Sequence, residues 1–97
     1  MSTIIRKITG NKSENYLTIS SEWDLRSQVD ALEQWLEKHG AELDSKFQWI
    51  ADIGFTPRTN ALGGGPPLTH HLMKMCINSN MEIYLSEYQR SDDDREE

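Results

Sequence analysis

The sequence has a single cysteine, Cys76, and no apolar run of the roughly 20 residues that a membrane-spanning helix needs. One cysteine excludes an intrachain disulfide and a zinc site built from several thiolates. Because Cys76 lies in the apolar stretch HLMKMCI, we predict a buried, unreactive thiol. The start, MSTIIRKITG, is interrupted by two basic residues and does not match a signal peptide, so we expect a cytoplasmic protein without membrane association.

The chain also lacks the composition of a disordered protein. Hydrophobic residues make up 36% of its 97 residues and charged residues 27%, which is typical of one globular domain. We assign residues 1–90 to this single domain. Residues 91–97, SDDDREE, are expected to form a disordered acidic tail.

Basic residues are too few and too scattered to favour nucleic acid as a direct partner. The net charge is −6, and the acidity is concentrated in two segments. Residues 22–42 hold six acidic and two basic residues, and the tail holds five acidic and one basic residue. This distribution favours a basic protein surface as a partner. The alternative is that a charged helix face and a solvated tail serve only solubility.

Two strands and a helix are predicted in the first 40 residues. The stretches 2–9 and 16–20 predict strands, and the turn formers of GNKSEN between them predict a hairpin. Ser21 to Asp24 has the form of a capping box, with Asp24 as an alternative N-cap. A helical stripe follows at spacings of four, three and four, and Gly40 can end it: Leu25, Val29, Leu32 and Leu36.

The second half predicts a strand, a long loop, a short helix and a last strand. FQWIADIGF, residues 47–55, alternates as a strand with a covered face does. The loop 56–68 is rich in glycine and proline, Thr69 can cap a helix, and MEIYL at 81–85 alternates again. The order β-β-α-β-α-β predicts an α+β fold, a two-layer sandwich in which two helices pack on one face of a small mixed four-stranded sheet.

The stretch LGGGPP in this loop does not match a nucleotide-binding motif. A phosphate-binding loop ends in Gly-Lys-Ser/Thr, whereas prolines follow the glycines here, and the dinucleotide fingerprint is absent. A hinge or flexible arm is one interpretation of the loop. A contact loop is the other, with Arg58 and Asn60 as polar contacts.

No arrangement of catalytic or metal-ligating residues stands out in the sequence. His70 and His71 are adjacent and point about 100° apart on a helix, so they cannot bind one ion as an i, i+4 pair does. Asp52 lies inside an apolar strand, where a solvent-facing or edge position explains it as well as a perturbed pKa does. We therefore predict no catalytic residue, no metal, no cofactor and no enzymatic activity.

The polar face of the predicted first helix offers the strongest candidate for a binding surface. It is acidic, and a tryptophan beside the apolar stripe belongs either to the edge of the core or to an interface. The partner-binding residues that we predict there and in the loop are Asp30, Glu33, Trp35, Glu37, Arg58 and Asn60.

Two stretches, YLTISSEWDLRSQVDALEQWLEKH and LTHHLMKMCINSNMEIYL, resemble the bacterial family called domain of unknown function 4279, over roughly residues 15–85. The matching positions lie in both helices and the closing strand: Leu25, Leu32, Leu36, Leu68, Thr69, Leu72, Ile83 and Tyr84. Family members are usually longer, with an extra N-terminal half, and the acidic tail is particular to this chain. The resemblance implies a non-enzymatic module, in some members an immunity protein that neutralises toxins of neighbouring bacteria.

Four hypotheses of function follow. The preferred one is a bacterial immunity or inhibitor protein that binds a basic toxin or nuclease through its acidic surface. A phage-encoded inhibitor of a bacterial defence system, acting by charge mimicry as an anti-CRISPR protein would, is the second. A small ligand-binding domain or enzyme with a site under the 56–68 loop is the third, its pocket walled by Trp49, Phe55, Met73 and Tyr84. A structural subunit or homodimer, paired through an exposed sheet edge, is the fourth.

Overall fold

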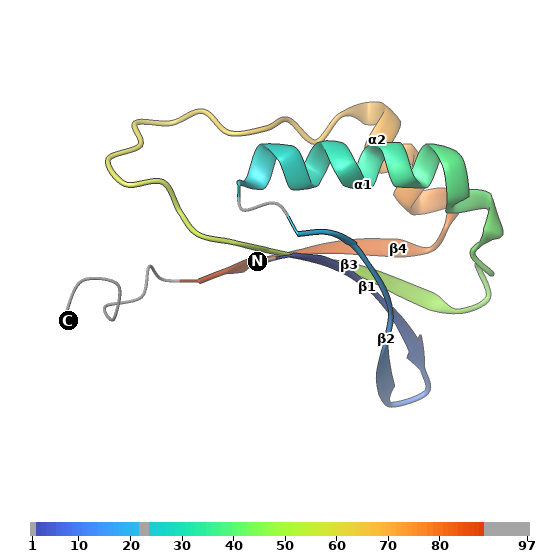
Figure 1. Cartoon of the computed structure of the whole chain (residues 1–97). Coiled ribbons are helices and arrows are strands. Elements are labelled where there is room, and N and C mark those ends of the chain that lie inside the picture. The colour runs from blue at the N-terminus through green and yellow to red at the C-terminus, as the bar shows by residue number, and fades with distance from the viewer. Residues whose placement is uncertain (1, 22–23, 89–97) are drawn as a thin grey trace.

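A computed structural model of the chain describes residues 2–21 and 24–88 (Figure 1). Its elements are β1 (Thr3–Thr9), β2 (Lys12–Ser20), α1 (Leu25–His39), a 3₁₀ helix (Gly40–Glu42), β3 (Gln48–Phe55), α2 (His70–Asn78) and β4 (Met81–Glu87). The predicted α+β fold is confirmed, because both helices lie on one side of a mixed four-stranded sheet. The predicted acidic tail, residues 91–97, falls outside the described residues.

The sheet has the strand order β2-β1-β3-β4. β1 pairs antiparallel with both β2 and β3, and β3 pairs parallel with β4. α1 therefore connects β2 to β3 across β1, and α2 connects β3 to its parallel neighbour. The second connection is the crossover that a helix between two strands predicts. β2 and β4 form the two edges of the sheet.

The hairpin differs from the sequence prediction in the length of its second strand. β2 begins at Lys12 rather than at residue 16, because pairing with β1 continues as far as Thr9 and Lys12. Ladder pairing thus overrides the turn preference of residues such as Asn15. The turn is reduced to Gly10 and Asn11, and Gly10 adopts a φ of 61°, which a glycine tolerates without strain.

Side-chain caps fix the start of both helices. The Asp24 carboxylate accepts hydrogen bonds from the Ser27 backbone N–H (2.9 Å) and hydroxyl (2.8 Å), so the alternative N-cap, not Ser21, begins α1. The Thr69 hydroxyl accepts from the Leu72 backbone N–H at 3.0 Å, as predicted for α2. Gly40 ends α1, but it keeps right-handed helical dihedrals and leads into the 3₁₀ helix.

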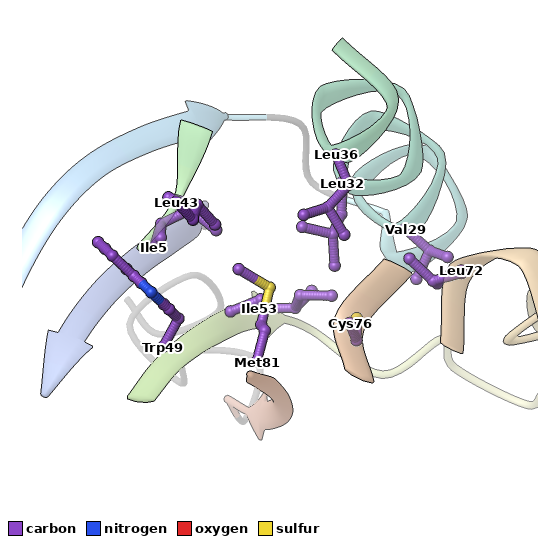
Figure 2. Close-up of a cluster of buried hydrophobic side chains, with 11 residues drawn as sticks. Ile5, Val29, Leu32, Leu36, Leu43, Trp49, Ile53, Leu72, Cys76 and Met81 are labelled. Carbon is purple, nitrogen blue, oxygen red and sulfur yellow. The ribbon is translucent and has the colours of Figure 1, made fainter. Parts of the chain in front are cut away.

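The core lies between the helices and the sheet (Figure 2). Val29, Leu32 and Leu36 of the predicted α1 stripe are buried, Leu25 is partly buried, and β3 contributes its alternate residues. α2 buries only a narrow face, so Met73 and Ile77 remain exposed. The buried cluster comprises Ile5, Val29, Leu32, Leu36, Leu43, Trp49, Ala51, Ile53, Leu72, Cys76 and Met81.

A buried polar contact, not predicted from the sequence, joins α1 to the sheet. Gln28 and Thr3 are both fully buried. The Thr3 hydroxyl donates to Gln28 Oε1 at 2.7 Å, and Gln28 Nε2 donates to the Gly54 carbonyl at 2.6 Å. Since these bonds satisfy the buried amide, they set the position of α1 above β1 and β3.

Truncation of the buried stripe should destabilise the fold far more than truncation of an exposed leucine. Leu32 is fully buried and Leu62 fully exposed. We expect Leu32→Ala to lower the free energy of unfolding by about 2–5 kcal/mol, because it leaves a cavity in the core. Leu62→Ala should change it by less than about 0.5 kcal/mol. Urea unfolding followed by circular dichroism measures both, and equal losses would contradict the described core.

Candidate functional site

Four polar residues of α1 form a continuous line along the helix, which we call the polar stripe: Arg26, Asp30, Glu33 and Glu37. Their spacings of four, three and four place them on one side. This side lies about 100° around the helix from the buried Val29, Leu32 and Leu36. Glu33 is therefore half-buried, whereas Arg26, Asp30 and Glu37 are exposed. The stripe holds three acidic residues and one basic residue, so its net charge is −2.

The end of the long loop runs beside the polar stripe. At one end, Arg26 Nη2 donates to the Gly65 carbonyl at 3.2 Å. At the other, His71 Nε2 lies 2.8 Å from Glu37 Oε2. Figure 1 shows the chain between these anchors passing along α1 before it enters α2. The stripe and residues 65–71 therefore form one surface built from two segments distant in sequence.

A cavity of about 480 Å³ opens where the loop leaves β3 and arches past the start of α1. Arg58 Nη2 donates to the Gly63 carbonyl at 2.5 Å, a hydrogen bond between two parts of the loop. Gly63, Gly64 and Gly65 have φ values of 117°, 84° and 108°, which side-chain-bearing residues rarely adopt. The lining residues are Asp24, Leu25, Arg26, Phe55, Thr56, Pro57, Arg58, Ala61, Gly63, Gly64, Gly65 and Pro66.

The cavity combines apolar walls with three charged groups. The backbone N–H and the hydroxyl of Ser27 hold the pKa of Asp24 below its ordinary value. Asp24 therefore stays ionised, and the guanidinium groups of Arg26 and Arg58 belong to the lining of the same cavity. Apolar walls with a few polar groups are the usual make-up of a small-molecule site, and the charge balance here favours an anionic group.

The structure brings together only some of the residues predicted to bind a partner. Asp30, Glu33 and Glu37 share the polar stripe. Arg58 lines the cavity, near the Arg26 end of the same surface. Asn60 is exposed in the loop with a φ of 62° and does not line the cavity.

Trp35 lies apart from this group. It is two positions from Glu33 and from Glu37, and residues at that spacing point to different sides of a helix. Its ring is half-buried against the core and lies 5.6 Å from the His39 ring, centroid to centroid. The structure thus supports the core-edge interpretation of Trp35.

The cavity under the loop also has walls other than those predicted. Of the four expected residues, only Phe55 lines it. Trp49 belongs to the core near the other end of β3, and its indole N–H donates to the Asp44 carbonyl at 3.0 Å. Met73, on α2, and Tyr84, on β4, are exposed elsewhere. Tyr84 pairs in register with Asp52 on the sheet face away from the helices.

The carboxylate of Asp52 is already occupied by neighbouring side chains. Arg6 Nη2 lies 3.0 Å from one of its oxygens, and the Ser86 hydroxyl donates to the other at 2.5 Å. Asp52 thus lies on the sheet face away from the helices, where its side chain is 18% exposed and has a partner on each neighbouring strand.

One grouping of polar residues was missed by the sequence prediction. A ligand-type atom of Glu33, Glu37 and His71 each lies within 4.8 Å of the other two. The i, i+4 spacing of the two glutamates was visible in the sequence. Their approach to His71, by contrast, depends on how α2 returns beside α1.

No protein-family model, curated protein or solved structure matches the chain. The resemblance to domain of unknown function 4279 therefore stays a prediction. Within residues 2–21 and 24–88, neither helix is long and apolar enough to cross a membrane.

The buried thiol of Cys76 gives a chemical test of the helix–sheet packing. Burial raises its pKa from 9.0 to about 11. Between about pH 9 and about pH 11 the unfolded thiol ionises while the folded thiol keeps its proton. Ionisation of the unfolded chain lowers the free energy of unfolding, so the contribution of Cys76 to stability is lost as the pH rises through this range. Below pH 9 we expect iodoacetamide to alkylate the folded protein much more slowly than the urea-unfolded protein. Equal rates, followed by mass spectrometry, would show that the thiol is accessible.

Proposed function

We propose that the protein is a non-enzymatic module that binds a basic partner protein through the polar stripe of α1 and the adjoining loop. The partner that suits this surface best is a toxin or nuclease, which the module neutralises as an immunity or inhibitor protein of the bacterial cytoplasm. The observation that carries the proposal is the acidic line of Asp30, Glu33 and Glu37, exposed at both ends and half-buried at Glu33, on a helix whose adjacent face packs in the core.

Preorganisation supports this role. The backbone of α1 is held by its buried leucines and by the Gln28 contacts, so the backbone positions that carry the three acids are fixed before any partner arrives. Binding then loses little conformational entropy, which is the main benefit of a rigid binding surface. The loop edge, tied to the stripe at Arg26 and Glu37, adds a second wall to the surface.

Electrostatics supports a basic partner. The net charge of −6 attracts a basic protein from a distance, and the stripe complements its positive groups at contact. Asp52, the acid within the sheet, is paired with Arg6 and Ser86, and the cavity that it lines is small, about 100 Å³. A phage-encoded inhibitor that mimics nucleic acid would use the same surface, and neighbouring genes distinguish the two roles.

Charge reversal on the stripe should slow association with the partner. We expect the wild-type chain to recover one basic protein in stoichiometric amount from source-cell lysate. With both proteins purified, the substitutions below should lower the association rate constant at low salt by about tenfold or more, since they remove electrostatic steering. Surface plasmon resonance measures the rate for Asp30→Lys, Glu33→Lys and Glu37→Lys combined.

A control variant changes net charge by the same amount at other exposed positions. It combines Glu14→Lys, Glu82→Lys and Glu87→Lys, on β2 and β4. The control should keep most of the wild-type affinity if the stripe itself is the contact. If both variants lose the same affinity for the partner, overall charge rather than the stripe determines binding. Unchanged binding in the stripe variant would refute the proposal.

The cavity favours a second candidate function, the binding of a small anionic ligand. Its volume of about 480 Å³ falls within the usual range of ligand pockets, and two arginines face apolar walls within it. A guanidinium pairs well with a carboxylate or phosphate group, while Leu25 and Phe55 would contact an apolar portion of the ligand. This site is distinct from the acidic part of the stripe.

A thermal-shift screen tests this second candidate. A panel of metabolite carboxylates and phosphates should include a compound that raises the melting temperature of the wild-type chain. Arg26→Ala and Arg58→Ala should remove the shift, whereas Lys12→Ala, on the distant hairpin, should retain it. A flat response across the panel would eliminate the candidate.

A further inference from the structure

The C-terminal half of α1 and the first turn of α2 bring three metal-binding side chains together. Glu33 and Glu37 lie one turn apart on α1, and His71 approaches from α2, with Nε2 2.8 Å from Glu37 Oε2. One ligand-type atom from each residue lies within 4.8 Å of the other two. We infer that Glu33, Glu37 and His71 form a binding site for a divalent transition-metal ion, with Zn²⁺ preferred over Mg²⁺ and Ca²⁺.

The spacing of the three groups suits a small ion. Zn²⁺ holds nitrogen and oxygen ligands at about 2.0–2.2 Å, so neighbouring ligands of a tetrahedral site lie roughly 3.3–3.6 Å apart. The observed separations, from 2.8 Å to at most 4.8 Å, bracket that value. Small side-chain rotations are therefore enough to close the site, and no backbone movement is needed.

The backbone beneath the cluster is fixed by the core. Leu32 and Leu36, which are fully and almost fully buried, hold the turns of α1 that carry both glutamates. Leu72, fully buried beside His71, and the Thr69 cap hold the first turn of α2. A site whose ligands come from two anchored helices is preorganised, unlike a set of acids on a flexible segment.

The donor set selects the kind of ion. An imidazole nitrogen suits zinc and its first-row neighbours, whereas Mg²⁺ and Ca²⁺ require oxygen ligands almost throughout. The two carboxylates would balance the charge of the ion. Three protein ligands leave a fourth position for water or another group. His71 and Glu37 are 55% and 50% exposed, so an ion reaches them directly from solvent.

A second histidine–carboxylate pair in the chain provides an internal comparison. His39 Nδ1 lies 3.2 Å from Glu42 Oε2. This pair belongs to no three-ligand group within the described segments, and it should bind an ion much more weakly than the cluster does. His70, next to His71 but pointing elsewhere on the helix, is the matched control for its neighbour.

The test uses the untagged full chain, freed of metal by a chelator, with no partner protein present. Its outcome is thus independent of the proposed binding function. Co²⁺ should give a saturable visible absorption band at one equivalent, which Zn²⁺ abolishes and excess Mg²⁺ does not. Titration calorimetry should show Zn²⁺ affinity lower by about tenfold or more in His71→Ala and Glu33→Gln, and nearly unchanged in His70→Ala and His39→Ala.

A stability measurement guards against loss of fold in the variants. Circular dichroism should show the same apo structure for all of them, because each substitution is at the surface or its edge. Zn²⁺ should raise the melting temperature of wild type and His70→Ala but not of His71→Ala. If no saturable metal binding is observed, the assignment is wrong, and His71 and Glu37 form only a hydrogen bond between the helices. Equal loss in His70→Ala, or equal competition by Mg²⁺, would also overturn the assignment.

Discussion

The burial of one face of α1 against the sheet is the interaction on which the rest of the molecule depends. Val29, Leu32 and Leu36 fill the space above the central strands, and Gln28 hydrogen-bonds within the same layer. A helix is rigid along its length, so fixing this face also fixes the direction of every other side chain on it. The position of the polar stripe is a consequence, so a core substitution that shifts α1 would also shift the stripe.

Because the loop before α2 runs beside α1, the exposed side of the helix becomes part of a larger surface whose two ends differ in charge. At the start of α1, Arg26 and Arg58 face the cavity beneath the loop. Further along the helix, Glu33 and Glu37 meet His71. The positive end suits the anionic group of a small ligand, while the negative end suits basic protein groups or a cation. A single partner that complements the whole surface must therefore carry charges of both signs, in a defined order.

Local sequence patterns predicted the elements well, because those patterns act within a few residues. The spacing of the α1 leucines, the alternation of β3 and the cap at Thr69 all appear in the structure. Contacts between segments that are distant in the sequence could not be predicted from such local patterns. The early start of β2 depends on its ladder with β1, and the approach of His71 to Glu37 depends on the return of α2. The prediction that Trp35 binds a partner together with the acids conflicts with its spacing of two from Glu33. That spacing alone puts the two side chains on different sides of the helix.

The like-charge pair within the stripe is itself informative, although His71 lies beside one of its two members, Glu37. Asp30 has Arg26 one turn before it, but Glu33 and Glu37 face each other as like charges at i, i+4. Such a pair costs a helix about 0.2–0.5 kcal/mol, which is small beside the several kcal/mol that burial of a leucine provides. The fold can therefore tolerate this repulsion but gains nothing from it. A positively charged group placed between the two carboxylates, whether a metal ion or a lysine of a partner, would turn the repulsion into attraction.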